Sequence, residues 1–419
     1  MLYYLGSLLD KWDVAGARLL HYVSFRATIA FVLALLLATW VGGAIIRKLR
    51  AHQIGETIRD LDLEGQLSKK GTPTMGGIII IIAIVIPTLL LARLDNVYII
   101  LMLLTTILMG ALGFADDYIK VFKKRKEGLH GRYKIIGQVV VGTVVASVLF
   151  LSPQAAIREN SETFEEGHVT EVNFAEKEVK STKTTIPFVK NNNFDYADLL
   201  PFKGDAKQIA GWLLFIVISI LIVTFISNSV NLTDGLDGLA AGCSAPVGVV
   251  LLIMAYVSSH IEMASYLNIM FIPSSEELVI FAAAFIGATL GFLWYNGYPA
   301  QVFMGDTGSL TLGGIIAAFA IMIRKEFLLP ILCGLFFVEG LSSLAQTAYF
   351  KITKRRTGTG KRIFKMSPLH HHFQKPGNSG IDALIQKPLH VIPESKITVR
   401  FWLIAMILAA LSIATLKMR

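Results

Sequence analysis

The chain has 419 residues, of which 54% are hydrophobic and 16% are charged, and its formal net charge is +9. With glycine counted as apolar and tyrosine left out, the apolar share is roughly 60%, against about 45–50% in soluble globular proteins, whose charged share is about 25%. These values exclude a soluble enzyme and a disordered chain, and they predict a membrane protein.

The positive charge does not require a nucleic-acid partner, because Lys and Arg collect in the cytoplasmic loops of membrane proteins. We therefore expect no binding of nucleic acid. The two cysteines, Cys243 and Cys333, lie in separate apolar runs and are expected to be small packing residues, not a disulfide. The first residues, Met1 to Tyr22, lack the basic start, apolar core and cleavage site of a signal peptide.

Ten apolar runs follow one another along the chain, each near the ~20 residues that a membrane-spanning helix needs. They cover residues 23–46, 75–93, 97–115, 133–151, 209–227, 235–257, 278–295, 308–323, 327–350 and 399–416. The ninth run continues into a basic stretch, so it could bend or project from the membrane. The runs predict an all-α integral membrane protein with ten transmembrane helices, forming a single polytopic domain over residues 1–419.

Basic residues indicate the orientation of these helices. Lys and Arg gather in the connections after the first, third and ninth runs, as with Arg47, Lys120 and Lys354. The positive-inside rule then places the odd-numbered connections in the cytoplasm and both termini in the periplasm. Residues 152–207, where acids outnumber bases, are expected to be an external polar loop with a small β-hairpin near 169–179. Residues 351–397 are expected to be a cytoplasmic loop that is basic and contains a histidine run.

The third run ends in two adjacent acids, Asp116 and Asp117. About 100° of helix separates their directions, so the two carboxylates can serve different partners. They are either a solvated helix end or a pair that handles a cation or a phosphate.

The sixth run opens with four amide or acid groups, Asn228, Asn231, Asp234 and Asp237. Asp234 and Asp237 are three residues apart and share one helical face. Capping of a helix N-terminus would explain one of these acids but not the whole group. A ligand site at the neighbouring Gly235 is the other interpretation, since glycine permits close approach of a ligand to the backbone.

The eighth run is preceded by a stretch that includes Gly305, Asp306 and Gly308. Exposed N–H groups at a glycine-rich helix start bind anions, and the adjacent carboxylate can hold the divalent cation that accompanies a phosphate. A plain N-cap is the alternative for Asp306. The run His370-His371-His372 is expected to contact phosphate or sugar, because consecutive histidines rarely converge on one zinc ion.

All four polar clusters fall in or beside odd-numbered connections, so they share the cytoplasmic face. This placement favours a cytoplasmic active site over a path through the membrane. Carboxylates for a hard cation, glycine-rich helix starts and basic loops suit a phosphorylated substrate with magnesium. The pattern therefore predicts exchange of a phosphoryl group at the membrane surface.

Five motifs, in this order, resemble those of the phospho-N-acetylmuramoyl-pentapeptide transferase (MraY) family, within the polyprenyl-phosphate sugar-1-phosphate transferase superfamily. They lie at residues 69–77, 116–118, 231–240, 303–310 and 370–373, and the likeness runs from about Tyr22 to the C-terminus. It implies Mg²⁺-dependent transfer of phospho-MurNAc-pentapeptide from UDP-MurNAc-pentapeptide to undecaprenyl phosphate, giving lipid I and UMP. It also implies a multi-pass protein of the cell inner membrane in contact with membrane lipid, and a homodimer is one assembly that it allows.

The resemblance also assigns residues. It implies Asp306 as the magnesium ligand and Asp116 with Asp117 as the catalytic pair near the lipid phosphate. The residues that it implies for binding the uridine and diphosphate are Lys69, Asn231, Asp234, Gly235, Leu236, Asp237, Asn296 and Phe303, with His370, His371 and His372 beside them. Which of Asp116 and Asp117 does what stays open, as does the choice between direct attack by the lipid phosphate and a covalent aspartyl intermediate.

The chain departs from the family in two places: Gln374 stands where an acid is usual, and the segments 375–397 and 152–207 are longer than usual. A polyprenyl-phosphate N-acetylhexosamine-1-phosphate transferase is the nearest alternative, but the histidine run and the motif from Gly71 to Gly77 favour the muramoyl branch. A transporter of a phosphorylated solute is an alternative of another class. It should place polar groups at the membrane midplane and on both faces.

Overall fold

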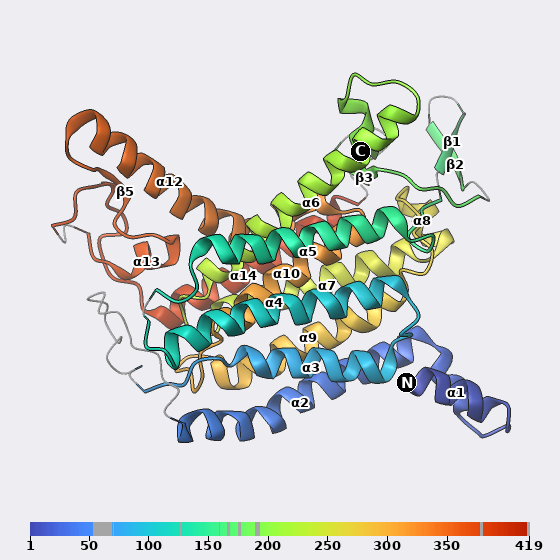
Figure 1. The fold of residues 1–419 in the computed structure, drawn as a ribbon, viewed down its shortest axis with the longest axis horizontal. Coiled ribbons are helices and arrows are strands. Elements are labelled where there is room, and N and C mark those ends of the chain that lie inside the picture. The colour runs from blue at the N-terminus through green and yellow to red at the C-terminus, as the bar shows by residue number, and fades with distance from the viewer. Residues whose placement is uncertain are drawn as a thin grey trace.

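The computed structural model describes residues 1–52, 69, 71–125, 127–158, 160–165, 168–174, 177–188, 193–377 and 380–416. Within these residues the chain is mostly helical, and its long helices run side by side in one bundle (Figure 1).

The long helices are α2 (Val23–Ala51), α3 (Gly77–Leu91), α4 (Val97–Val121), α5 (Gly131–Leu151), α6 (Asp205–Thr233), α7 (Leu239–Ser258), α9 (Glu277–Asn296), α10 (Gly305–Met322), α12 (Gly334–Thr357) and α14 (Glu394–Ala414). The short helices are α1 (Leu2–Asp10), α8 (Ile261–Leu267), α11 (Leu329–Leu332) and α13 (Leu369–Gln374). Helical turns of the 3-10 type cover Ala17–His21, Tyr196–Leu199 and Glu326–Leu328.

Eight of the described helices are long and apolar enough to cross a membrane: α2, α4, α5, α6, α7, α9, α10 and α14. The predicted run 327–350 is not one straight helix, because the segments Glu326–Leu332 and Gly334–Thr357 meet at 82°. The predicted run 75–93 is represented by α3, which has only 15 residues. The helix begins only after Met75, because the φ of Met75 is +71° and lies outside the helical region. The N–H groups of Gly76 and Gly77 donate to the carbonyl oxygens of Phe303 and Met304, both at 2.8 Å.

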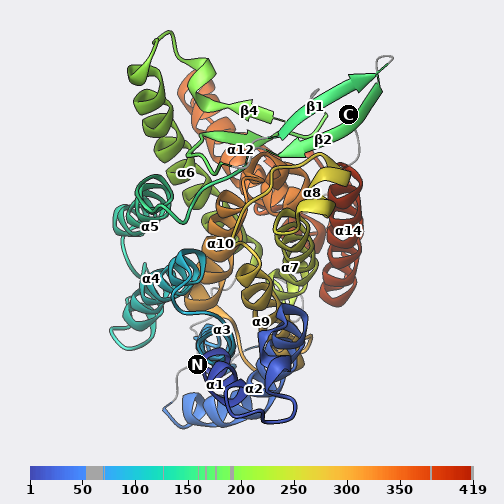
Figure 2. The same cartoon turned by 90° about the vertical axis from the view of Figure 1, so that its right-hand side faces the viewer.

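Helix α10 lies at the centre of the bundle, and every residue from Thr307 to Met322 is buried. It packs against α3, α4 and α6, while α9 packs between α2 and α7. Seen along the bundle in Figure 2, α2, α5, α6 and α14 surround this centre, and they bury only 28–33% of their most apolar stretch. The outer helices therefore present the apolar surface that lipid would cover.

Among the residues that the structure describes, three small two-stranded sheets lie outside the bundle. Strand β1 (Asn160–Glu165) pairs antiparallel with β2 (His168–Phe174), and β3 (Lys183–Thr185) pairs antiparallel with β4 (Asn193–Asp195). A hairpin is thus present in the segment 152–207, as predicted, but it covers residues 160–174, so only its second strand overlaps the alternating stretch 169–179. Strands β5 (Arg362–Phe364) and β6 (Ala383–Ile385) pair in parallel beside α12.

A buried ion pair joins α2 to α9 at the end of the bundle where the N-terminus lies. The guanidinium of Arg26 donates to both carboxylate oxygens of Glu277, at 2.9 and 2.7 Å, and both side chains are nearly inaccessible. The same carboxylate accepts the N–H of Arg93 at 2.8 Å. Since buried charges are costly unless paired, this contact fixes α2, α9 and the connection after α3 relative to one another.

Candidate active site

Three carboxylates meet where the end of α4 crosses the start of α10. Asp116 and Asp117 come from α4 and Asp306 comes from α10, and oxygen atoms of the three lie within 4.8 Å of one another. Asp116 and Asp117 are buried, whereas the side chain of Asp306 remains 13% exposed. The structure therefore brings together the three acids that the sequence pattern singled out from two distant segments, and one of them reaches the surface.

Asp117 accepts hydrogen bonds from the first turn of α10. The N–H of Asp306 donates at 3.1 Å, the N–H of Thr307 at 2.9 Å and the hydroxyl of Thr307 at 2.6 Å. These N–H groups have no partner inside their own helix, so the carboxylate satisfies them and also meets the positive end of the helix dipole. Gly305 has φ +71°, and an added Cβ there would lie 2.6 Å from an Asp117 oxygen.

Two lysines bridge the other two acids. The Lys120 ammonium lies 2.6 Å from Asp116 and 3.3 Å from Asp306. The Lys134 ammonium lies 3.0 Å from Asp116 and 2.6 Å from Asp306. Sequence reasoning missed both roles, although Lys120 stands four residues after Asp116, a spacing that pairs charges on a helix.

Asn231 belongs to the same centre. Its side-chain amide donates to Asp306 at 3.0 Å and to the hydroxyl of Ser309 at 2.8 Å. The 231–240 motif and the 303–310 motif, which were expected only on the same face, are therefore in direct contact, and Ser309 helps to position Asp306 through Asn231.

Backbone contacts hold the start of α10 between α3 and α4. An added Cβ at Gly77 would lie 2.1 Å from the nitrogen of Gly308, and one at Gly113 would lie 2.2 Å from the carbonyl oxygen of Asp306. Real Cβ atoms essentially never approach backbone this closely. The two glycines therefore permit the helix crossing that brings Asp306 to Asp116 and Asp117.

A second charged group lies around Lys69. Its ammonium is 2.6 Å from Asp237 and 2.5 Å from Glu394, and it faces the ring of Phe303 at 5.9 Å from the centroid. Burial opposes its charge, but the carboxylates of Glu394 and Asp237 outweigh that effect and raise the pKa of Lys69. The other Asp237 oxygen accepts the N–H of Ala300 at 2.9 Å. Glu394 is a member that sequence reasoning missed.

The other residues expected to bind the donor, in the 231–240 motif and at Asn296 and Phe303, differ in how exposed they are. The side chain of Asn296 accepts the N–H of Gly238 at 3.1 Å and donates to the carbonyl of Val302 at 2.9 Å, so it fastens two loops together. Leu236 is buried, whereas Asp234 and Phe303 are half-buried and Gly235 is exposed. Of these, Asp234, Gly235 and Phe303 have surface that a ligand can reach.

The three consecutive histidines have three different partners. His370 Nδ1 lies 3.1 Å from the Glu339 carboxylate, which also accepts the His370 N–H at 3.1 Å. His371 Nδ1 contacts Gln374 at 2.7 Å. His372 Nδ1 accepts the N–H of Lys365 at 3.1 Å, and its Nε2 lies 2.8 Å from the carbonyl of Lys387. This divergence agrees with the expectation that the run does not hold one metal ion.

His370 is the member of the run that faces the 231–240 motif. Its Nε2 is buried and has no hydrogen-bond partner among the described residues. An added Cβ at Gly235 would lie 2.2 Å from this nitrogen. Because Glu339 engages Nδ1, Nε2 is the ring nitrogen that remains without a hydrogen-bond partner, and it packs against Gly235. His372 instead faces the loop before α14.

Acid should destabilise the protein through His371. Burial, followed by the neighbouring His370, lowers the pKa of His371 from 6.5 to about 3. Between pH 6.5 and about 3, His371 is protonated in the unfolded chain but not in the folded one. The free energy of unfolding therefore falls as the pH drops from 6.5 towards 3. We expect the melting temperature in detergent to fall less between pH 7 and pH 4.5 in His371→Gln than in the wild type. The exposed His260→Gln should keep the wild-type slope, and equal slopes in all three proteins would contradict this assignment.

The acidic cluster has the donors that a hard divalent cation prefers, since Mg²⁺ and Ca²⁺ take oxygen ligands and usually one or more carboxylates. Two ammonium groups and three carboxylates leave an excess of one negative charge at the cluster. The three acids could therefore hold a metal ion, and the lysines beside them could bind a phosphate.

Comparison with known proteins finds matches that cover the whole chain. The model of glycosyl transferase family 4 matches residues 99–324, and phospho-N-acetylmuramoyl-pentapeptide-transferase signature 1 matches residues 69–81. Relatives named phospho-N-acetylmuramoyl-pentapeptide-transferase include those of Porphyromonas gingivalis, Parabacteroides distasonis and Bacteroides thetaiotaomicron. They are 72%, 66% and 57% identical to this chain, each over 100% of both chains.

Proposed function

The chain belongs to the phospho-N-acetylmuramoyl-pentapeptide-transferase family, and we propose that Asp116, Asp117 and Asp306 form its catalytic centre. It is a multi-pass membrane protein that transfers phospho-MurNAc-pentapeptide in peptidoglycan synthesis. The observation that carries the proposal is the meeting of three carboxylates and two lysines at one helix crossing.

In the proposed reaction, an oxygen of undecaprenyl phosphate attacks the phosphorus that carries the MurNAc-pentapeptide. A new phosphorus–oxygen bond forms, the bond from this phosphorus to the bridging oxygen of the diphosphate breaks, and UMP leaves with that oxygen. The product is lipid I. Charge neutralisation should matter more than proton removal, because a phosphate monoester with a second pKa near ~6 is mostly dianionic at neutral pH.

Mg²⁺ fits the oxygen donors of Asp306, Asp116 and Asp117, and when bound it would offset the negative charge of the diphosphate. Asp306 is the principal ligand in this proposal because it is the acid of the three with exposed surface. Lys120 and Lys134 would exchange their contacts with carboxylates for contacts with phosphate oxygens. Asn231 and Ser309 keep the Asp306 side chain in place.

The remaining motif residues would hold the donor. Lys69 and Phe303 form the charged and aromatic sides of the uridine and diphosphate pocket, and Asp234 and Gly235 lie at its open edge. Three further residues support this pocket without facing the donor, because their side chains bind or pack against neighbouring loops: Asp237, Asn296 and Leu236. His370 offers Nε2 to the donor, with His371 and His372 shaping the segment around it.

The geometry supports direct attack over a covalent intermediate. Asp117 already accepts three hydrogen bonds, and Asp116 is engaged by two lysines and by the N–H of Leu129 at 2.7 Å. These contacts hold both carboxylates in place, which disfavours movement of either one towards the phosphorus as a nucleophile. Incubation with UDP-MurNAc-pentapeptide in the absence of lipid phosphate should leave the intact mass of the protein unchanged. An added mass equal to the phospho-sugar on Asp116 or Asp117 would refute direct attack.

Glu339 should act on the reaction through His370. Glutamine at this position keeps the size of the side chain but removes the negative charge that favours a proton on His370 Nδ1. The proton can then move to Nε2, which changes Nε2 from an acceptor to a donor. We expect kcat/KM to fall about 10- to 100-fold in Glu339→Gln, less than the ~10⁴-fold loss seen when a histidine loses its partner in a hydrolytic triad. Glu339→Gln should add nothing to the effect of His370→Ala in the double variant. Additive losses would mean that Glu339 acts independently of His370.

We place the centre on the cytoplasmic face of the inner membrane, with both termini outside and residues 1–419 forming one polytopic domain. The support is the basic character of the connections at the same end as the acidic cluster. The homodimer stays a prediction.

The function is tested with protein purified in detergent, undecaprenyl phosphate and Mg²⁺. We expect release of UMP from UDP-MurNAc-pentapeptide and none from UDP-N-acetylglucosamine. The reverse preference would move the chain to the hexosamine-1-phosphate branch.

A further inference from the structure

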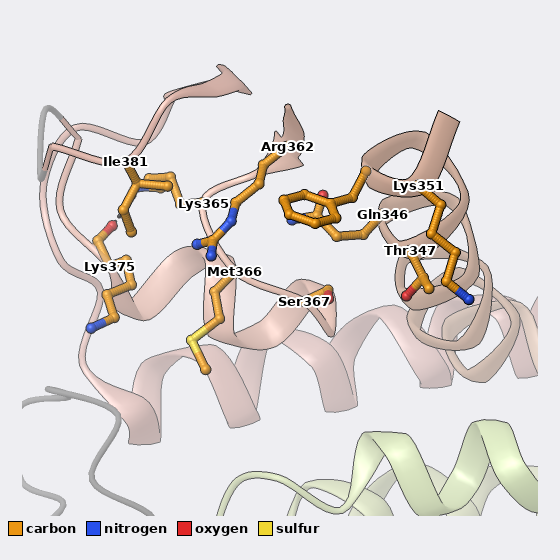
Figure 3. Close-up of a pocket in the computed structure, with 10 residues that line it drawn as sticks. Gln346, Thr347, Lys351, Arg362, Lys365, Met366, Ser367, Lys375 and Ile381 are labelled. Atoms are coloured by element: carbon orange, nitrogen blue, oxygen red, sulfur yellow. Dashed lines mark hydrogen bonds between the residues drawn. The ribbon is translucent and has the colours of Figure 1, made fainter. Parts of the chain in front are cut away.

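A pocket lies beside the C-terminal half of α12, and none of the three acids of the centre lines it (Figure 3). Its volume is about 510 Å³, within the range of ligand sites in proteins, ~300–1,000 Å³. One wall is α12 around Phe350, and the other is formed by β5 and the segment that follows it.

Four of the residues that line this pocket are cations, namely Lys351, Arg362, Lys365 and Lys375, and none is an acid. Figure 3 shows the Arg362 side chain reaching between Lys375 on one side and α12 on the other. Among the residues that the structure describes, neither Lys351 nor Arg362 forms an ion pair. The pocket thus concentrates positive charge that a carboxylate or phosphate group would neutralise.

Lys365 adds a positive charge that is buried in the segment after β5. Its side chain is completely buried, and its ammonium donates to the carbonyl oxygens of Lys375 and Pro388. No carboxylate of the described residues lies within salt-bridge distance of it. A buried cation that is solvated only by carbonyl oxygens favours an anion nearby.

The walls of the pocket are fixed to each other. The side-chain carbonyl of Gln346 on α12 accepts the N–H groups of Ile363 and Phe364, at 2.9 and 3.0 Å, and its amide donates back to the carbonyl of Phe364. Arg362 belongs to this strand, so its position relative to Lys351 on α12 is set by the folded backbone.

The pocket is close to the donor site. Ser367 lines it, and three residues later His370 faces Gly235. Three residues of extended chain span at most ~11 Å, whereas an extended pentapeptide spans up to ~17 Å. A peptide attached to a sugar at Gly235 can therefore reach the side of the pocket that Ser367 lines.

We propose that this pocket binds the peptide arm of the donor through its free carboxylates, and the proposal rests on the function assigned above. The peptide is joined to the muramoyl group through its amino end, so at least its C-terminal carboxylate is free. Lys351 and Arg362 are the residues that meet it, and Lys365 supports them electrostatically. They are specificity-determining residues and take no part in the chemical step.

The test compares UDP-MurNAc-pentapeptide with the same donor whose peptide carboxylates are converted to carboxamides. The amidated donor is measured as a competitor of the normal reaction, so it need not be turned over itself. In the wild type we expect it to bind about 10-fold more weakly, as two partly exposed charge contacts would give. In the double variant Lys351→Gln/Arg362→Gln, the pentapeptide donor should weaken to the same level and the amidated donor should not change.

The matched control is Lys354→Gln/Arg356→Gln, which removes two charges from the same helix outside the pocket and should bind both donors like the wild type. Equal weakening of both donors, or no weakening, in the pocket variant would overturn the proposal. A change confined to the KM of undecaprenyl phosphate would overturn it in favour of a lipid head group. Failure of the assigned function would look different, because the wild type would then release no UMP from the pentapeptide donor.

Discussion

Replacement of Asp306 by asparagine is expected to lower the rate of UMP release about a thousandfold or more, and added magnesium is not expected to restore it. Asparagine keeps the size of the side chain, and its carbonyl oxygen can still accept the hydrogen bond from Asn231. It removes the negative charge that both lysines contact and that a cation would need. The loss should therefore appear in kcat and persist at saturating donor.

The matched control for this variant is Asp198→Asn, which removes an exposed acid whose partner is the exposed Lys207. It should retain full activity. Melting curves of Asp306→Asn in detergent should show a folded protein, so that the loss is assigned to chemistry. A near-normal rate, or a rate that rises to normal with magnesium, would exclude Asp306 from the central role.

Alanine at Gly113 is expected to lower activity about a hundredfold or more and to reduce thermal stability, without altering any group that reacts. The added methyl would lie 2.2 Å from the carbonyl oxygen of Asp306 and 2.6 Å from the Cα of Thr307. Both contacts are to backbone, so no side chain can move aside, and α4 must separate from α10. Asp117 stands one helical turn after Gly113 and would lose its alignment with the first turn of α10.

Gly131→Ala provides the control for this prediction, since no atom lies within 4 Å of a Cβ at Gly131. UMP release and melting temperature are measured for both variants under the same conditions. Wild-type behaviour of Gly113→Ala in both measurements would show that the α4–α10 crossing does not set the geometry of the acids.

Most of the helices could be predicted from the sequence because an apolar run of sufficient length has few other interpretations. The exceptions are set by tertiary contacts. Helix α3 begins only after Met75, whose φ is +71°, where the N–H groups of Gly76 and Gly77 donate to Phe303 and Met304, far away in the sequence. The ninth run was expected to bend or project, but nothing in its composition locates the 82° bend at Cys333.

The acids of the centre could be found because carboxylates at the ends of apolar runs are costly and tend to be functional. Their lysine partners were harder to find. Lys120 belongs to a basic stretch that also marks the cytoplasmic side, so its charge had another explanation. Glu339 lies inside an apolar run, and its partner His370 is 31 residues away, so only the folded chain reveals the pair.

The segment between α12 and α14 is fastened at several points in the described structure. The N–H of Gly377 donates to the carbonyl of Leu389 at 2.8 Å, and the N–H of Ile392 donates to that of Phe373 at 3.1 Å. The ring of His372 contacts the backbone at both Lys365 and Lys387. Much of the conformational entropy of these residues is therefore lost when the protein folds and not when the donor binds. Association of the donor should accordingly show little of the unfavourable entropy that ordering a free loop would bring.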